Sequence, residues 1–561
     1  MHLSESGQTF HQGTEGGPGP VPESHAPGDS FFGGPRGTRL LILLPAAVCV
    51  AALLAVCVWV EGFLPDDGTG PALLHESWDV LSIEGVRVGG SHQRQWQMLQ
   101  QGQPRIVTEA DESLRVLRQG QAVHLEVTYR CEETLTGEML SCRSRQQTGA
   151  GPPVVQTGQV RGGRLLLKQQ VGNDPTERTI DWPTQTHGYF GIEASLQHQM
   201  LVPGERRNLQ YLVPLLNQLG QCELHATGFE TVELASGLIR LLRIEATIHR
   251  AGTTTHRTLW CDGAGEVILS LEPALNLTSE RTTREVAQWQ TPSPHYDIMA
   301  RSLVPIDPPI EAPHDQAKLV YQVQLQRNSP MEVFASDDRQ QVKPLGPQRA
   351  LLTVHAAWLN TEKGTPLPAE RRHPPATPRA QPAPAPEPAA LAASRFIQSD
   401  DPRIIAFAGR VLPGQETADQ DTANVQPLAV GLEKLVHNWI NENHYQQIFA
   451  SAREVFESRR GDCTEHAVLL AAVCRARKIP ARLVVGLVYV PSQQGFLFHL
   501  WTEGWWAGRW HGLDATLGRG GIGATYLKLH AFTLADDNML AEMTAVSQVI
   551  GQLEIHLVEQ Q

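Results

Sequence analysis

The sequence lacks a cluster of basic residues. Its 561 residues include 46 Lys and Arg against 59 Asp and Glu, which gives a formal net charge of −13 at pH 7. Proteins that bind nucleic acids usually do so through a basic patch that faces the phosphates. We therefore expect no nucleic-acid partner.

Two further features are missing. No acidic loop has the spacing of calcium ligands, so the sequence does not support dependence on calcium. No internal repeat with a regular period occurs either. A chain of this length is expected to hold about three to four domains and the linkers between them.

Long apolar runs are equally scarce, since only Leu40–Val60 is both uncharged and long enough to cross a bilayer, which takes about 20 residues. Arg36 and Arg39 precede this run, and acidic residues follow it. The positive-inside rule then places the N-terminus in the cytoplasm and everything after Val60 outside it. We expect a single-pass membrane protein with a transmembrane helix at residues 39–61.

A cleaved signal peptide is the alternative interpretation of the same run. The segment before the run is long, and no small-x-small cleavage site follows it. Leu54–Cys57 only approximates a lipoprotein box, because Val56 is too large for the position before the cysteine. An uncleaved anchor is therefore favoured.

Composition divides the rest of the chain. Residues 1–38 are rich in Gly, Pro, Ser and His, which predicts a disordered cytoplasmic tail. Residues 71–360 alternate with period two, as in Val123–Tyr129, which predicts a β-rich extracytoplasmic region of one or two domains. Many prolines mark residues 361–392 as a Pro-rich linker or exposed loop. A last domain then occupies residues 395–561.

The cysteines fit a chain divided between compartments. The β-rich region holds an even number of them: Cys131, Cys142, Cys222 and Cys261. Cys131 and Cys142 are equidistant from Thr136–Gly137, so a two-residue hairpin there would set them opposite each other. The same register makes them a hydrogen-bonded pair, which is the poorer geometry for a disulfide. A bond between them stays open, as does one between Cys222 and Cys261.

One sharp chemical signal lies between residues 461 and 516. Cys463 opens an apolar helix, His499 lies on a predicted strand, and Asp514 ends the next predicted strand. A cysteine, a histidine and an aspartate in this order supply a nucleophile, its base and the group that orients the base. These are the parts of a thiol acyl-transfer site.

The local pattern supports these placements. Asp462 and Glu465 form a capping-box pattern, which puts Cys463 in the first helical turn, where free N–H groups and the helix dipole favour a thiolate. The apolar helix ends before Pro480. Three strands are expected to follow, the last two joined by a turn at Ala507–Gly508: Ala481–Val490, Phe496–Glu503 and Trp510–Asp514.

These residues resemble the transglutaminase-like superfamily of papain-like thiol enzymes. The likeness runs through Gly461–Ala467, Arg477–Arg482, His499–Glu503 and Trp510–Thr516. The chain's layout resembles that of bacterial membrane-anchored transglutaminase-like proteins. Family members usually have Gly where this chain has Lys478, a helix-end position at which we expect Lys to cost little.

The resemblance implies an α+β fold class. In it, the helix that carries the cysteine packs on an antiparallel sheet, and a large β-rich region and one N-terminal transmembrane helix precede this core. The resemblance also implies acyl transfer from a protein or peptide carboxamide through a thioester on Cys463. His499 would move the protons and Asp514 would hold the imidazole tautomer. We expect neither a cofactor nor a metal; the oligomeric state stays open.

Other interpretations remain open at this point. With water as the acceptor, the same site would make a cysteine peptidase or an amidase. A non-catalytic binding or scaffold protein could share the fold, as could a membrane-tethered β-domain protein that recognises a partner. A half zinc site at Cys463 and His466 lacks a second Cys/His pair nearby.

Several nearby residues have structural interpretations. Cys474 is expected to be a small buried apolar residue and His466 a packed helix residue. For Glu503, a structural role near the sheet is favoured over orienting a neighbouring group. The core and the walls of the cleft are expected to hold Trp501, Trp505, Trp506 and Trp510.

Overall fold

Thr69–Gln561 forms one compact unit. The computed structural model describes residues 71–118, 120–149, 153–171, 174–214, 216–250, 253–273, 276–288, 296–359, 385–411, 422–442, 450–535, 542, 546 and 548–561. The tail and the apolar run predicted at residues 1–61 lie outside this set, as does most of the Pro-rich stretch.

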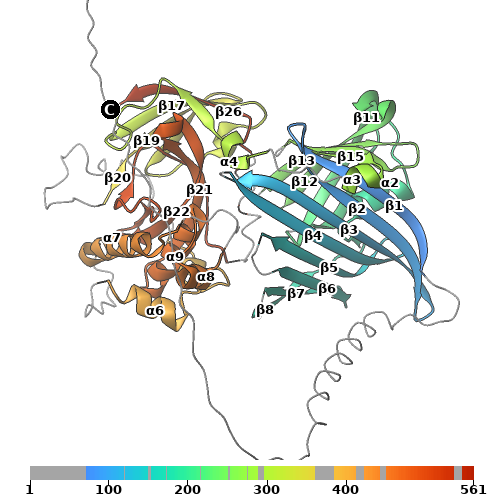
Figure 1. Ribbon diagram of the computed structural model, residues 1–561, viewed down its shortest axis with the longest axis horizontal. Coiled ribbons are helices and arrows are strands. Elements are labelled where there is room, and N and C mark those ends of the chain that lie inside the picture. Colours follow the sequence, from blue (N-terminus) through green and yellow to red (C-terminus); the bar gives the residue numbers. More distant parts are fainter. Residues whose placement is uncertain are drawn as a thin grey trace, which may run out of the picture. The chain divides into compact units, whose positions relative to one another are not determined.

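The first sheet is an almost entirely antiparallel meander (Figure 1). Its strands are β1 (Ala72–Ile83), β2 (Val86–Gln100), β3 (Gln103–Arg118), β4 (Gln121–Thr134), β5 (Met139–Thr148), β6 (Val154–Arg161), β7 (Arg164–Val171), β8 (Asp174–Asp181), β9 (Thr186–His187), β10 (Arg206–Val213), β11 (Gln218–Leu234), β12 (Gly237–Arg250), β13 (Thr253–Cys261), β14 (Val267–Glu272) and β15 (Leu277–Thr282). Three helices accompany them: α2 (Gly191–His198), α3 (Arg284–Gln288) and α4 (Ile298–Arg301). The strand order runs from β8 back to β1, then from β15 back to β9.

This sheet curls on itself. Leu165 of β7 and Leu212 of β10 belong to one buried cluster, although their strands lie near opposite ends of the strand order. Ile192 and Leu196 of α2 pack into a second cluster with Leu224 of β11. Long alternating strands give each face a continuous row of side chains, and curling buries the apolar row.

The second sheet carries the predicted site. Its strands are β16 (Val304–Asp307), β17 (Lys318–Leu325), β18 (Gln340–Gly346), β19 (Arg349–His355), β21 (Ala481–Val490), β22 (Gly495–Trp506), β23 (Arg509–Leu513), β25 (Tyr526–Phe532) and β26 (Leu553–Gln560); β20 (Ala357–Trp358) pairs separately with β24 (Gly521–Ile522). Its helices are α5 (Pro330–Val333), α6 (Pro402–Ala408), α7 (Thr422–Trp439), α8 (Ala452–Ser458) and α9 (Cys463–Ala476), with 3-10 turns at Pro388–Ala390 and Pro491–Gln493.

The strand order of this second sheet joins segments that are far apart in the sequence. It reads β18-β19-β17-β26-β16-β22-β21-β25, with β23 beside β22. The last strand, predicted from the alternation of Leu553, Ile555 and Leu557, therefore lies between β17 and β16. Strands from both sides of residues 361–392 thus build one sheet around β22.

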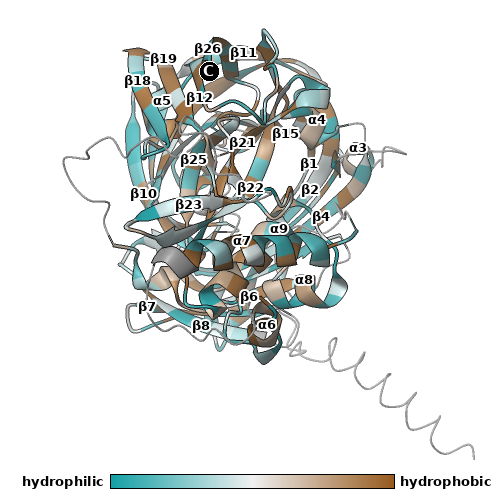
Figure 2. Cartoon of the chain, turned by 90° about the vertical axis from the view of Figure 1, so that its left-hand side faces the viewer, coloured by the Kyte–Doolittle hydropathy of each residue, from teal (hydrophilic) through white to brown (hydrophobic). Residues whose placement is uncertain are grey.

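Helix α9 is the centre of the helical layer. It packs on β22 and β21, and α6, α7 and α8 surround it (Figure 2). Every residue from Val468 to Cys474 has no exposed surface. Thr502 of β22 donates a hydrogen bond to the Ala467 carbonyl at 2.9 Å, which fixes the helix to this strand. Helix α7 turns an apolar face to this core, with Leu432 and Val436 fully buried.

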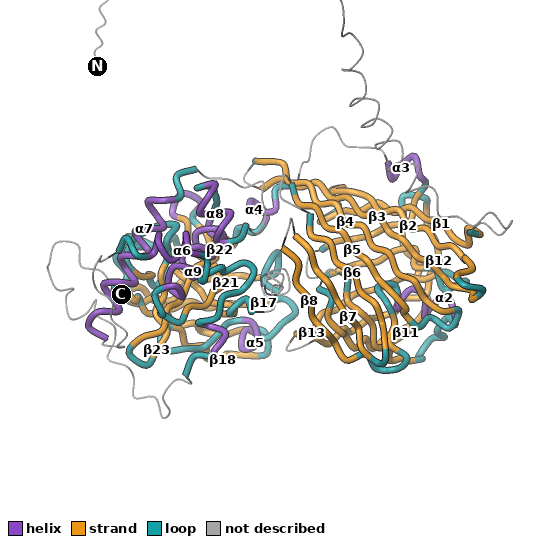
Figure 3. The backbone as a smooth tube through the Cα atoms, turned by 90° about the horizontal axis from the view of Figure 1, so that it is seen from below, coloured by secondary structure: helices purple, strands orange, loops and turns teal. Residues whose placement is uncertain are grey.

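The expected α+β class is wrong, because 54% of the described residues are in strands and 17% in helices. Figure 3 shows strands through nearly all of the chain from β1 to β15. The reason is strand length: β11 has 17 residues and β3 has 16, whereas an average strand has about five or six. The transmembrane helix expected at residues 39–61 lies outside the described residues. Of the helices that are described, none has the length and apolar character needed to cross a membrane.

The six cysteines in the described residues are free thiols. Cys131 and Cys142 do lie directly opposite each other on β4 and β5, and both are buried. Cys222 and Cys261 pair with different residues of β12, which separates their strands. Two strand spacings amount to roughly 9.5 Å, beyond the reach of a disulfide.

Side chains cap three helix starts, and the capping box predicted at Asp462 is confirmed. Asp462 and Ser451 both form complete capping boxes, and Asp401 caps α6 with Pro402 in the first turn. Their side chains satisfy backbone N–H groups that the helix leaves unpaired.

The end of α9 differs from expectation. Lys478 has a φ of 61°, in the left-handed region that favours glycine. The hydrogen bonds from Lys478 N to Arg475 O and from Ile479 N to Cys474 O, both 2.9 Å, form a Schellman motif around it. Lysine at this position therefore carries a conformational cost, and the expectation that it costs little is wrong.

Replacing Lys478 with glycine should stabilise the protein by about 1 kcal/mol, because a side chain in the left-handed region costs about this much. The Lys478 side chain is exposed, so little packing is lost. Urea unfolding measures the change. Lys478→Ala is the matched control and should give no comparable gain, since it keeps the Cβ. Equal stability of Lys478→Gly and Lys478→Ala would contradict a conformational cost at this position.

Candidate active site

The start of α9 places Cys463 at a partly exposed helix terminus. The Asp462 carboxylate accepts a hydrogen bond from Thr464 N at 2.9 Å, and Glu465 accepts one from Asp462 N at 3.0 Å. Gly461 is required by close packing, because a Cβ there would lie 2.2 Å from the Glu465 Cβ. The Gly-Asp-Cys order therefore follows from how the chain turns into the helix.

His499 lies on β22 beside this helix start and is buried. Its Nε2 lies 2.9 Å from the Asp514 carboxylate. The side chains of His499 and Cys463 are also hydrogen-bonded. Since Asp514 engages Nε2, the Nδ1 atom is left for the thiol. The structure thus brings the three predicted site residues together in the expected order.

Asp514 follows β23 and is held from two further directions. One carboxylate oxygen accepts a hydrogen bond from Thr516 N at 2.9 Å. The oxygen that faces His499 also accepts one from the Tyr526 hydroxyl at 2.7 Å. These contacts leave the carboxylate little freedom to rotate away from the imidazole.

Burial and mutual attraction act in opposite directions on this pair. Burial disfavours the charge on His499, but the charge of Asp514 and the hydrogen bonds to Asp514 and Cys463 outweigh it and raise the pKa of His499 to about 10. Burial likewise opposes ionisation of Asp514, yet His499 and the hydrogen bonds from Tyr526 and Thr516 lower its pKa to about 2. At neutral pH the site therefore holds an imidazolium beside a carboxylate.

Sequence reasoning missed Glu433 and Tyr526. Glu433 lies on α7, is fully buried and accepts a hydrogen bond from Asp514 N at 3.0 Å. Its signal in the sequence is an acidic residue directly after Leu432 and three positions before Val436, both of which are apolar. Tyr526 gave no such signal, because a tyrosine on a buried strand is ordinary.

Aromatic rings close the buried side of the site. Trp501, 1% exposed, lies two residues beyond His499 on the same face of β22, with ring centroids 6.4 Å apart. It meets Tyr526 edge to face at 5.5 Å. This agrees with the predicted role of Trp501 as a core residue.

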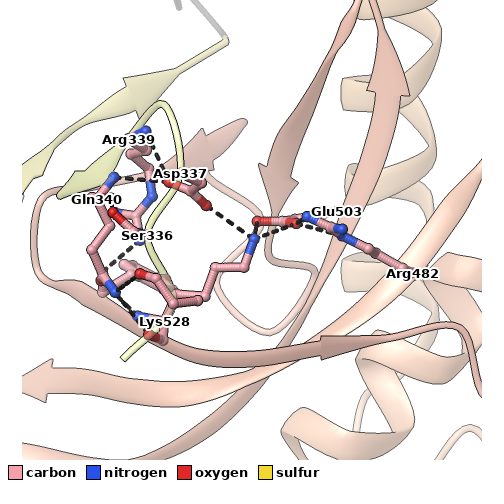
Figure 4. Close-up of polar contacts among 9 residues, drawn as sticks. Ser336, Asp337, Arg339, Gln340, Arg482, Glu503 and Lys528 are labelled. Carbon is pink, nitrogen blue, oxygen red and sulfur yellow. Dashed lines mark hydrogen bonds and ion pairs between the residues drawn. The ribbon is translucent and has the colours of Figure 1, made fainter. Parts of the chain in front are cut away.

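Glu503 is occupied elsewhere (Figure 4). Its carboxylate accepts hydrogen bonds from Lys528 Nζ at 2.8 Å and from Arg482 at 2.6 and 2.8 Å. Lys528 also contacts Asp337 at 3.0 Å, which ties β25 and β22 to the loop before β18. The predicted structural role of Glu503 is confirmed by these ion pairs.

His466 is a packed helix residue, as predicted. Its Nδ1 lies 2.7 Å from the Asp462 carbonyl oxygen, and the ring is buried. Across the described part of the chain, no group of three or more His, Cys, Asp or Glu is arranged to hold a metal ion.

Comparison with known families adds to this geometry. Residues 415–515 match the model of the transglutaminase-like superfamily. The chain contains a transglutaminase-like domain. The matched segment includes Cys463, His499 and Asp514, so the resemblance carried by the motifs is confirmed. This match supports a thiol enzyme of that fold.

Two solved structures show a weak similarity to this chain. A candidate cysteine protease from Cytophaga hutchinsonii is 14% identical, with a TM-score of 0.25, over 44% of this chain and 86% of that one. A candidate protease from Parabacteroides distasonis is 12% identical, with a TM-score of 0.18, over 70% of this chain and 68% of that one. The search of curated proteins gave no match.

Iodoacetamide should label Cys463 far faster than Cys474. Cys474 has no exposed surface, and burial raises the pKa of its thiol to about 12. Peptide mapping after brief labelling measures both rates. Equal slow labelling of the two thiols would contradict the thiolate assignment.

The raised pKa of Glu433 predicts that the stability of the folded protein depends on pH. Burial raises its pKa to about 8, from an ordinary value near 4.5. The folded state therefore holds this proton more tightly than the unfolded state, so the Glu433 contribution to stability falls as pH rises from about 4.5 to 8.

The amide of Glu433→Gln can still accept from Asp514 N but does not titrate. Wild type should lose stability relative to this variant across that pH window, by on the order of 1 kcal/mol or more, since one pKa unit corresponds to about 1.4 kcal/mol. Urea unfolding at several pH values measures it, with Glu442→Gln, at an exposed carboxyl, as control. Parallel stability curves for wild type and Glu433→Gln would refute the prediction.

Proposed function

We propose that this protein is a transglutaminase-like acyltransferase that forms a thioester between Cys463 and a carboxamide group of a protein or peptide. The observation that supports it best is the buried His499–Asp514 pair, hydrogen-bonded to the Cys463 thiol at a helix N-terminus. A thiolate beside an imidazolium is the activated form of a cysteine nucleophile.

In the first half-reaction the Cys463 sulfur attacks the carboxamide carbon, and the carbonyl electrons move onto oxygen. The Cys463 backbone N–H would stabilise this oxyanion, together with a second donor that is not identified. When the carbonyl re-forms, the C–N bond breaks, His499 donates its proton to the nitrogen, and ammonia leaves. The enzyme then carries a thioester.

In the second half-reaction a primary amine attacks the thioester. His499 accepts a proton from the amine, and the C–S bond breaks with the Cys463 thiolate as the leaving group. The acyl carbon is then bonded to the amine nitrogen in a new amide. Asp514 keeps the imidazole in the required tautomer through both halves. The thiolate–imidazolium pair is restored at the end.

A glutamine-containing peptide and a labelled primary amine test the proposal with the purified chain. We expect amine incorporation and stoichiometric ammonia release. Ammonia release without incorporation would replace the acyltransferase with an amidase, and cleavage of the peptide would replace it with a peptidase. Absence of all three products would contradict an enzymatic role.

Variants of the three residues should behave as one unit in whichever of these assays is positive. Cys463→Ala and His499→Ala should each abolish turnover, and Asp514→Asn should lower it about 10⁴-fold without unfolding, because the amide favours the wrong tautomer. Adding Asp514→Asn to His499→Ala should then change little. Cys474→Ala, a buried cysteine outside the site, is the control and should keep turnover. Near-normal turnover of Asp514→Asn would mean that the third member is misassigned.

A further inference from the structure

A residue of the first sheet reaches the start of the nucleophile helix. Arg118, the last residue of β3, has its guanidinium 2.6 Å from the Asp462 carboxylate. The two side chains are only 12% and 6% exposed. Asp462 is the N-cap of α9 and directly precedes Cys463, so this ion pair lies beside the predicted nucleophile.

The backbone around Arg118 is fixed on both sides. Leu117 N donates to the Tyr296 carbonyl at 2.7 Å, and Gly120 N donates to the Asp297 carboxylate at 2.8 Å. Asp297 is also the N-cap of α4. The end of β3 is therefore anchored to the segment that leads into the second sheet.

That segment continues directly to the strand of the catalytic histidine. Helix α4 is followed by β16, whose Val304 pairs with Phe496 of β22. His499 lies three residues further along the same strand. The end of β3 is thus linked to the strand of His499 through α4 and β16.

The negative charge at the start of α9 is stabilised by a nearby cation. Asp462 and Glu465 bring two buried carboxyl groups together, and burial, followed by the charge of Asp462, raises the pKa of Glu465 well above its ordinary range. The Arg118 charge acts in the opposite direction on Glu465. An Asp462 carboxylate without Arg118 would oppose formation of a thiolate on the adjacent residue.

Other titratable groups face this region. His466 lies on α9 itself, His499 on β22 and Asp514 after β23. The His499 and Asp514 charges largely compensate each other. Arg118 is the cation in direct contact with Asp462.

We propose that Arg118 is a positioning residue of the thiol site: through its ion pair with Asp462 it fixes the start of α9 and offsets the acidic charge next to Cys463. This inference rests on the proposed role of Cys463 as nucleophile. It assigns the first sheet a part in the active site, because the sheet supplies a charge that the transglutaminase-like segment at residues 415–515 does not contain.

The test is the pH dependence of Cys463 alkylation by iodoacetamide in the full chain. Arg118→Ala should move the acid limb of the rate profile upward by about one pH unit, which is about a tenfold loss of rate at a fixed pH on that limb. Arg118→Lys should restore most of the rate. In an Asp462→Asn background, Arg118→Ala should move the limb no further, because the charge it offsets is gone.

Arg130→Ala is the matched control, since Arg130 is a β4 residue that pairs with Glu109 within the first sheet. It should leave the profile unchanged, and circular dichroism confirms that each variant is folded. An unchanged limb in folded Arg118→Ala, or an equal shift with and without Asp462→Asn, would overturn the inference. If Arg118→Ala does not fold, a wild-type profile for Arg118→Ala/Asp462→Asn supports the inference and a shifted one overturns it. Failure of wild-type Cys463 to react faster than Cys474 would instead count against the proposed function.

Discussion

The site depends on the buried contact between His499 and Asp514. Both side chains are buried, so each charge is stabilised chiefly by the other and by the few hydrogen bonds around them. The surrounding structure serves this contact: Tyr526 and Glu433 hold Asp514, and Thr502 fixes the strand of His499 to α9. Such a pair tolerates little displacement, which explains why three strands and two helices converge on it.

The parts of the site that the sequence predicted are those set by local chemistry. The capping box at Asp462, the buried helix after it and the three following strands all rest on residues a few positions apart. The turn at Ala507–Gly508 is of this kind too, because both residues have positive φ in a two-residue hairpin between β22 and β23. Local patterns could therefore place Cys463, His499 and Asp514 on their elements.

The remainder could not be predicted because it depends on contacts between distant segments. The fold class was predicted wrongly because alternation in the sequence indicates a strand but does not show that many long strands pair into one large sheet. The position of β26 between β17 and β16 leaves no local trace. Glu433 and Arg118 each act through a residue far away in the sequence. The conformational cost of Lys478 could not be predicted either, because it depends on the φ of this residue.

Nuclear magnetic resonance of the full chain with 15N-labelled histidine measures the central contact directly. We expect that His499 has both ring nitrogens protonated from neutral pH up to about pH 10, with the Nε2 proton in a strong hydrogen bond to Asp514. Assignment by comparison with His499→Gln identifies its signals. A His499 ring that loses its proton near its ordinary pKa of about 6.5 would contradict the account.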